Sequence, residues 1–464
     1  MTSKRKLIIS IFALAIIIVI FFGSVTLCSY AIPKKAIIIL PGLFASGLYN
    51  TETGKMVWDP FDGLEEIAFS DLMQNGDINL QGVLNLLGEE CVGKELGRLM
   101  DNDNYGASDS IFNNIAMNED GTPKVPTVKP VPWNSESRLR YGVVNAQKGM
   151  QETLEAEYGS EYDVQVFNYD FRADSRVNGR LLEEYINAQG YSEVILVSHS
   201  NGGEVAATFL GRSQENRNKV SKYISYDSPY LGAFAALGTL ENLDNMVEGV
   251  VQALNDAGNP LGLADDVQQI FDNQFKQVAN MWTVYQLLPS YDLLKLNYGG
   301  ESFKIFVDDV EQVFNSEQEL YEFYCSRPWA KMSNGELRPP MVEWLDYINS
   351  MKVTMPDGTK VHSTTLVDTT YFSGKGINSV NQIYFKTQGD SFVEEKEKNV
   401  FSLDSDGTVL LASATAGVTD SSKIVSLEYA DHYAFVTAYD EIAAQKTIEL
   451  INKSRPWYDL LWNF

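Results

Sequence analysis

A serine flanked by small residues stands at the end of an apolar, β-branched run, in the sequence V-I-L-V-S-H-S-N-G-G over residues 194–203. This pattern is typical of a nucleophile elbow, a sharp strand-to-helix turn that pushes a serine hydroxyl into a cleft. The usual form is G-x-S-x-G, and Ser198 here takes the place of the first glycine. Because the turn requires little bulk beside the nucleophile, serine is an acceptable replacement. We interpret Ser200 as a candidate nucleophile.

A serine hydroxyl is a poor nucleophile, so it needs a general base, and the base needs an acid that fixes its tautomer. Around a nucleophile elbow the chain order is serine, acid, histidine. After Ser200 only His362 and His432 remain. His432 lies between an expected strand and the last expected helix, where such a base belongs, and is therefore favoured.

The acid is expected on a loop between the elbow and the base. The sequence L-D-S-D-G-T-V over residues 403–409 has the composition of a turn that could hold a carboxylate at a strand end. We favour Asp406, which precedes a glycine, and keep Asp404 as the alternative.

Acyl transfer also requires donors for the developing oxyanion. The backbone N–H of Asn201, which follows the nucleophile, is one candidate. The loop after the first strand usually supplies the second, which indicates Leu43 after Pro41 and Gly42.

Strands that alternate with helices must position these residues. The sequence predicts strands at 36–40, 163–167, 194–199, 220–226, 382–386 and 423–427, and helices at 144–158, 176–188, 204–210 and 435–453. This alternation indicates an α/β fold, with a mostly parallel sheet and helices on both faces.

The alternation stops between the two halves of this pattern. Helical segments are predicted at 240–257, 264–287, 308–325 and 340–351. We therefore expect a core over 35–232 and 380–464, with a mainly helical cap inserted at 233–379. Apolar cap residues could form an acyl pocket, although core packing is the simpler interpretation of each: Met281, Trp282, Tyr285, Leu287 and Leu288.

The amino terminus reads as an export signal. Lys4, Arg5 and Lys6 precede an apolar run over residues 7–27, and Ser29-Tyr30-Ala31 is a fair cleavage site. The run is also long enough to span a bilayer. A cleaved signal peptide and a retained anchor over 1–31 both stay open, and each places the remainder of the chain outside the cytoplasm.

Composition limits the partners. The chain has 464 residues, 44% of them hydrophobic, and a formal charge of −26. Because such an acidic chain repels phosphates, we expect no nucleic acid partner. No C-x-x-C motif or histidine cluster is present, and we expect neither a metal nor a cofactor. Cys91 and Cys325 could form a disulfide or remain free thiols.

Four segments resemble the family of lecithin:cholesterol acyltransferase and lysosomal phospholipase A2, including its bacterial members. They are I-I-L-P-G-L at 38–43 with Trp58, N-Y-D-F-R at 168–172, S-H-S-N-G-G at 198–203, and D-S-D-G-T-V at 404–409 with His432. The segments occur in the family's order and cover roughly 36–232 and 380–452. Two features depart from the pattern: the first elbow glycine is absent, and the cysteine pair around the lid tryptophan is not seen.

The resemblance implies an α/β-hydrolase fold with a cap and an exported lipid acyl hydrolase or O-acyltransferase. A lipid or other ester would be its substrate, and a membrane surface is a candidate partner. A plain carboxylesterase or triacylglycerol lipase is the second hypothesis. A catalytically inactive hydrolase scaffold that serves in binding is the third.

Overall fold

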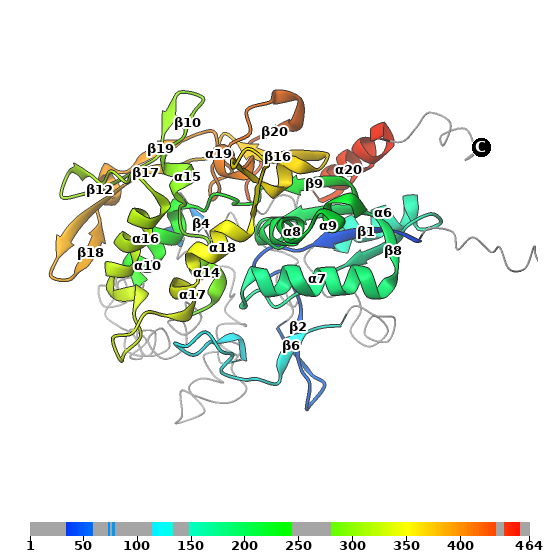
Figure 1. Ribbon diagram of the computed structural model, residues 1–464, viewed down its shortest axis with the longest axis horizontal. Coiled ribbons are helices and arrows are strands. Elements are labelled where there is room, and N and C mark those ends of the chain that lie inside the picture. Colours follow the sequence, from blue (N-terminus) through cyan, green and yellow to red (C-terminus); the bar gives the residue numbers. More distant parts are fainter. Residues whose placement is uncertain are drawn as a thin grey trace, which may run out of the picture.

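The computed structural model describes residues 34–58, 73–74, 77–78, 114–132, 148–243, 280–432 and 440–454. Figure 1 shows a central sheet with helices on both sides, joined to a second group of strands and helices. The expected export segment at 1–31 lies outside the described residues. Among the described helices, none has both the length and the apolarity needed to cross a bilayer.

The central sheet has six strands in the order β20-β16-β9-β8-β1-β7, and every neighbouring pair is parallel. The strands are β1 (Lys34–Leu40), β7 (Asp163–Val166), β8 (Tyr191–His199), β9 (Val220–Tyr226), β16 (Thr369–Lys375) and β20 (Ile424–Glu428). The predicted α/β architecture is therefore confirmed.

The middle strands are apolar along their length because both faces of the sheet are covered. In β1, Ile37 and Ile39 point into one hydrophobic cluster, while Ala36, Ile38 and Leu40 point into the other. All five side chains are fully buried. This alternation separates two cores, one on each face of the sheet.

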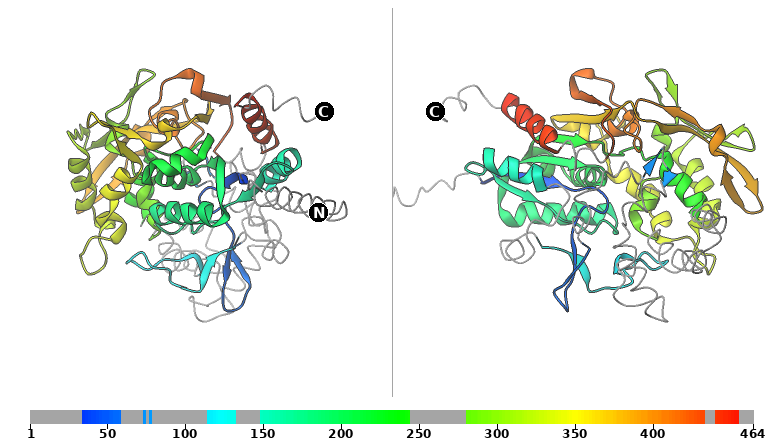
Figure 2. Two further views of the ribbon diagram at one scale, coloured as in Figure 1. Left: turned by 45° about the vertical axis from the view of Figure 1, so that its right-hand side comes forward. Right: turned by 180° about the vertical axis from the view of Figure 1, so that it is seen from behind.

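Helices α6 (Lys148–Tyr158) and α20 (Asp440–Ser454) pack together on the face that carries Ile37 and Ile39. Helices α7 (Ser175–Gln189) and α8 (Asn201–Arg212) cover the opposite face, with α9 (Gln214–Lys219) following α8 (Figures 1 and 2). Each parallel crossover thus places a helix on the sheet, and the loops that leave β8, β9 and β16 meet at the carboxyl edge.

A second, five-stranded sheet lies on the side of the molecule remote from α20 (Figures 1 and 2). Its strands are β12 (Lys304–Val307), β13 (Val310–Glu311), β17 (Ser379–Gln388), β18 (Ser391–Glu394) and β19 (Val400–Ser402). The helices of this region are α10 (Phe234–Glu241), α14 (Trp282–Gln286), α15 (Tyr291–Leu294), α16 (Glu317–Ser326), α17 (Pro339–Val342) and α18 (Trp344–Ser350).

The division between the two sheets does not coincide with the cap boundary that was expected at residue 379. The strand predicted at 382–386 belongs to β17 and pairs with β12 in the second sheet. The strand beside β9 in the central sheet is instead β16, which pairs with β9 and β20. The inserted region therefore includes much of 380–402, while residues 369–375 belong to the core.

The helix predicted at 308–325 is shorter in the structure, because its first residues form a hairpin turn and a strand. Asp308 and Asp309 both have positive φ, 49° and 63°, and turn the chain from β12 into the antiparallel β13. Two consecutive residues with positive φ are typical of a tight hairpin turn. Only Glu317–Ser326 is helical. The helix predicted at 240–257 lies outside the described residues from 244 onward, as does the one at 264–287 up to 279.

Candidate active site

The chain turns sharply at Ser200, between β8 and α8. Ser200 has φ 51° and ψ −129°, a conformation that side chains other than glycine rarely adopt. Its N–H donates to the carbonyl of Tyr226 at 2.9 Å, which ties the turn to the neighbouring strand. This is the geometry of a nucleophile elbow.

Close packing around the turn explains the small residues. A Cβ at Gly202 would lie 2.2 Å from the carbonyl oxygen of Leu40, so α8 can approach β1 only without a side chain there. Ser198 replaces the usual first glycine without cost, because its hydroxyl is buried within 2.7 Å of the Tyr223 hydroxyl. The departure from the G-x-S-x-G pattern therefore leaves no unsatisfied polar group at that position.

Three side chains that are distant in sequence form a hydrogen-bonded chain at the carboxyl edge of the sheet. The Nε2 atom of His432 lies 2.8 Å from Ser200 Oγ, and its Nδ1 lies 2.6 Å from Asp406 Oδ2. With a proton on Nδ1, the ring donates to Asp406 and accepts from the Ser200 hydroxyl. His432 is 4% exposed and Asp406 is 1% exposed. This arrangement can activate a hydroxyl for attack on a carbonyl carbon.

The two candidate acids occupy different environments. Asp406 accepts the N–H groups of Thr408 and Val409 through Oδ1, at 2.8 and 2.6 Å, and turns at Gly407, whose φ is 92°. Asp404 lies on the rim, one third exposed, and pairs with Lys375 at 2.9 Å. The structure thus brings Asp406, and not Asp404, to His432.

Replacing Asp406 with asparagine is expected to lower turnover about 10⁴-fold, because the amide keeps the shape but leaves the imidazole in the wrong tautomer. Asp404→Asn is the matched control on the same loop. It loses only an exposed ion pair and should stay within about threefold of wild type. Steady-state ester hydrolysis at one pH measures both. If Asp406→Asn kept wild-type ester hydrolysis and Asp404→Asn lost it, the assignment would be reversed.

The predicted oxyanion donors lie on either side of the elbow. Asn201 begins α8, and Leu43 follows Gly42 at the end of β1. Within the described part of the chain, neither N–H donates to a protein acceptor. A Cβ at Gly42 would lie 2.9 Å from His199 Nδ1, so this loop approaches the nucleophile closely only because residue 42 is glycine. Both N–H groups therefore stay candidates for the oxyanion donors that acyl transfer requires.

Buried polar side chains hold this loop and the start of α8 together. The hydroxyl of Tyr169 donates to the carbonyl of Pro41 at 2.6 Å and also lies 3.0 Å from Asn201 Oδ1. The amide of Asn201 donates to Glu204, which also accepts from the Tyr347 hydroxyl. Burial raises the pKa of Glu204 to about 8. The N-Y-D-F-R segment therefore supports the oxyanion side of the site through Tyr169.

Glu204 makes stability depend on pH. Its pKa rises from 4.5 in the unfolded chain to about 8 in the fold, so the unfolded state releases a proton that the native state retains. The resulting contribution to the free energy of unfolding is fully present below pH 4.5 and is lost as the pH rises toward 8. The variant Glu204→Gln cannot ionise at this position, so its stability does not fall in this pH range for this reason. Its melting temperature relative to wild type should therefore climb between pH 4.5 and 8.

Thermal unfolding of the two proteins across this window measures the effect. Glu184, an exposed glutamate on α7, provides the control variant Glu184→Gln, whose difference from wild type should be flat. A flat difference for Glu204→Gln would show that Glu204 is ionised in the fold.

His199 is a supporting residue that the sequence analysis missed. Its Nε2–H donates to the carbonyl of His432 at 2.7 Å, and the two rings lie 5.0 Å apart. Burial, together with the neighbouring His432, lowers the pKa of His199 to about 3 and keeps it neutral. Its position next to the nucleophile was the available signal, because a long side chain there can reach the loop that carries the base.

The other predicted residues lie apart from the triad. The Nδ1 atom of His362 lies 2.7 Å from the hydroxyl of Thr364, and the structure does not bring His362 to Ser200. Cys325 is a free, half-buried thiol, and Cys91 lies outside the described residues. Within the described ranges, no group of three or more histidine, cysteine or acidic residues could hold a metal ion.

The proposed acyl-pocket residues are mostly core. Met281 and Leu288 are fully buried in the main cluster, and Trp282 donates to the carbonyl of Gly121 at 3.0 Å. Tyr285 lines a cavity of about 560 Å³ together with Trp329 and other residues. None of the three triad residues lines this cavity.

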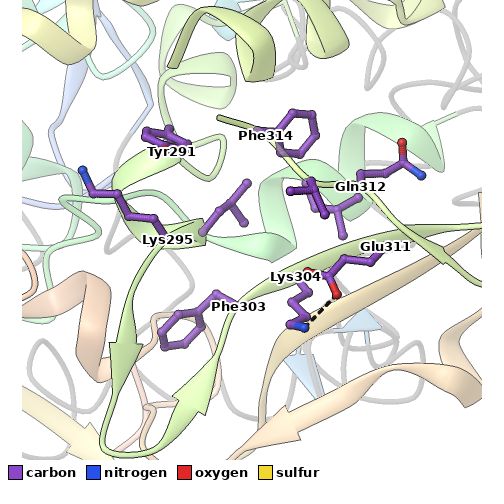
Figure 3. A pocket seen from close by; sticks show the side chains of 10 residues that line it. Tyr291, Lys295, Phe303, Lys304, Glu311, Gln312 and Phe314 are labelled. Carbon is purple, nitrogen blue, oxygen red and sulfur yellow. Dashed lines mark hydrogen bonds and ion pairs between the residues drawn. The ribbon is translucent and has the colours of Figure 1, made fainter. Parts of the chain in front are cut away.

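Figure 3 shows a smaller cavity of about 80 Å³, lined by Tyr291, Phe303 and Phe314 among others. Lys304 and Glu311 form an ion pair of 2.7 Å within its lining (Figure 3). The volume is well below what a drug-sized ligand fills. The triad residues do not line this cavity either, so neither space is assigned to substrate.

Comparisons with known proteins agree with the sequence motifs. The family model described as lecithin:cholesterol acyltransferase matches residues 135–418, which is more than half of the chain. No curated protein matches the sequence.

Two solved structures show distant similarity. A chain in the crystal structure of the Tle4-Tli4 complex is 14% identical, with 89% of this chain and 96% of that chain covered and a TM-score of 0.42. The mature form of the Bacillus licheniformis lipase BlEst2 is 14% identical, with 65% and 85% covered and a TM-score of 0.28. The hydrolase architecture rests on the sheet topology and the family match.

Proposed function

Because the chain belongs to the lecithin:cholesterol acyltransferase family, we propose that it is a serine lipid acyl hydrolase or O-acyltransferase that works outside the cytoplasm. Family membership supports an enzyme that acts on lipid esters. The single observation that supports the mechanism best is the hydrogen-bonded chain from Ser200 through His432 to Asp406.

The proposed reaction has two halves. Ser200 Oγ attacks the ester carbonyl as its proton passes to His432 Nε2, and Asp406 stabilises the imidazolium that forms. The N–H groups of Leu43 and Asn201 receive the oxyanion. His432 then gives its proton to the leaving alcohol, and an acyl group remains on Ser200.

The second half decides between hydrolysis and transfer. His432 removes a proton from water or from an acceptor alcohol, which attacks the acyl carbon. The bond to Ser200 Oγ then breaks, His432 returns the proton to Ser200 Oγ, and a fatty acid or a new ester is released. Nothing in the triad itself selects one nucleophile over the other, since both present an O–H group. The choice therefore depends on which molecule reaches the acyl-enzyme.

Location outside the cytoplasm is proposed from the basic residues at 4–6 and the apolar run at 7–27. Fractionation of producing cells, with protease added to intact cells, tests this part. Recovery of the full-length chain in the cytoplasm, protected from protease, would contradict it.

The activity is tested by incubating the exported chain with mixed phospholipids and alcohol acceptors and identifying the products by mass spectrometry. We expect free fatty acid or new fatty esters, absent in Ser200→Ala. Turnover restricted to short-chain esters or triacylglycerols would support the carboxylesterase or lipase alternative. A protein that is inert to all esters and to fluorophosphonates would support the non-catalytic alternative.

A further inference from the structure

A second buried aspartate lies directly behind the acid of the triad. Asp227 follows the end of β9, is fully buried, and has a positive φ of 43°. The N–H of Gly374, in the adjacent strand β16, donates to both oxygens of its carboxyl group, at 3.0 and 3.2 Å. The side chain of Asp406 also lies against Gly374, so the two buried carboxyl groups are neighbours, and the charge of Asp406 helps to raise the pKa of Asp227.

The packing around this pair is close. A Cβ at Gly374 would lie 2.7 Å from Asp406 Cβ and 2.0 Å from the carbonyl oxygen of Ala430. Glycine at this position therefore allows β16 to end between the two carboxyl groups, with its N–H directed at one of them. The proximity of the aspartates is built into the strand ends and does not depend on exposed side chains.

Two neighbouring carboxyl groups buried inside a protein cannot both be ionised, so the pair shares one proton. The other partners show which group keeps the charge. Asp406 accepts hydrogen bonds from two backbone N–H groups and from His432 Nδ1. Asp227 accepts one backbone N–H, from Gly374. The stronger set of donors stabilises the anion on Asp406.

We propose that Asp227 is a positioning residue of the triad: as a neutral carboxyl group, it donates its O–H to the carboxylate of Asp406. This inference rests on the proposed function of the triad. The hydrogen bond fixes the carboxylate plane of Asp406 against His432 and spreads its negative charge. Burial and the charge of Asp406 raise the pKa of Asp227 well above its usual range, in agreement with a retained proton.

A hydrogen bond from Asp227 makes the carboxylate of Asp406 less basic. A carboxylate that receives an additional hydrogen bond attracts the imidazolium less strongly. The strength of the hydrogen bond between Asp406 and His432 therefore depends on Asp227. In the part of the chain that the structure describes, His432 and His199 are titratable neighbours of the pair, and His199 is neutral above about pH 3 and so does not titrate in this window.

Two variants of Asp227 separate the effect of its hydrogen bond from the effect of its side-chain volume. Asp227→Asn can still donate from its amide to Asp406 and accept from Gly374, so it should lose only a few fold in kcat. Asp227→Ala cannot donate and should lose about 10- to 100-fold, with its acid limb of kcat/KM moved to higher pH by on the order of one unit. The pH profile is a readout that a merely structural role would not move.

A direct measurement covers the case in which Asp227→Ala does not fold. At neutral pH the infrared spectrum of Asp227→Asn should lose part of the protonated-carboxyl intensity of the wild-type protein, and the remainder belongs to other neutral carboxyl groups such as Glu204. An unchanged band intensity would overturn the proposal. So would an Asp227→Ala enzyme with wild-type kcat and acid limb, or an Asp227→Asn enzyme as impaired as the alanine variant.

This design also distinguishes failure of the inference from failure of the proposed function. Fluorophosphonate labelling of wild-type Ser200 reports whether the triad is active at all. If the wild-type protein is labelled but substitution of Asp227 has no effect, only the inference is rejected. If the wild-type protein is not labelled, the triad itself is rejected. The infrared band reports on the Asp227 proton in either case.

Discussion

Replacing Ser200 with alanine is expected to abolish both fluorophosphonate labelling and ester turnover while leaving the fold intact. The alanine removes the hydroxyl that is hydrogen-bonded to His432 Nε2. Loss of one member of a catalytic triad commonly costs on the order of 10⁴ or more in rate. Intact-mass spectrometry after probe treatment measures the labelling, and fatty acid release measures turnover.

Ser198→Ala is a matched control for this variant. Ser198 lies two residues away and is buried against Tyr223 and not against His432. It should keep its label and most of its activity, with a modest loss of stability from the lost hydrogen bond. Activity of Ser200→Ala within tenfold of wild type would reject Ser200 as the nucleophile.

Replacing His432 with alanine is expected to match the loss in Ser200→Ala, because both residues act in one proton transfer. The double variant Ser200→Ala/His432→Ala should be no worse than either single variant, since residues that act as a unit are non-additive. Initial rates of ester hydrolysis, measured to the same detection limit for all three proteins, test this expectation.

His362→Ala is the matched control for histidine loss. His362 hydrogen-bonds Thr364 and packs against the ring of Tyr230, at a centroid distance of 5.0 Å. The variant should therefore affect stability more than kcat. An inactive His362→Ala beside an active His432→Ala would show that the base was misassigned.

The elbow and its partners could be predicted because they follow local rules. An apolar strand, a small-residue turn and a helix are adjacent in sequence at 194–212, and the order of serine, acid and histidine selects His432 over His362. The distinction between Asp406 and Asp404 followed from Gly407, whose positive φ turns the loop at that position. These inferences needed no knowledge of which strands are neighbours.

The second sheet could not be predicted in this way. Strand β17 alternates between buried and half-buried side chains over Ser379–Phe385, as expected when one face of a sheet is covered and the other is not. Strand β16 is polar in composition, T-T-Y-F-S-G-K, although its first six residues are buried in the central sheet. The hydroxyls of Thr369 and Ser373 donate to the nearby carbonyls of Thr364 and Gly374, so these polar residues can be buried.

Asp227 shows the same limit at the site itself. In sequence, D-S-P after a strand is an ordinary turn. Only the pairing of β9 with β16 brings its carboxyl group to Gly374 and Asp406. Supporting residues such as Asp227 and Tyr169 act across strands, so their roles follow from topology more than from motifs.

The most direct test of the central claim is to trap the acyl-enzyme. The purified protein is mixed with a phospholipid, quenched in acid within the first turnovers, digested and examined by mass spectrometry. We predict a fatty acyl group on the peptide that contains Ser200, absent in Ser200→Ala and accumulating when acceptor alcohols are omitted. Products formed with no acyl group on Ser200, or with the group on another residue, would contradict the account.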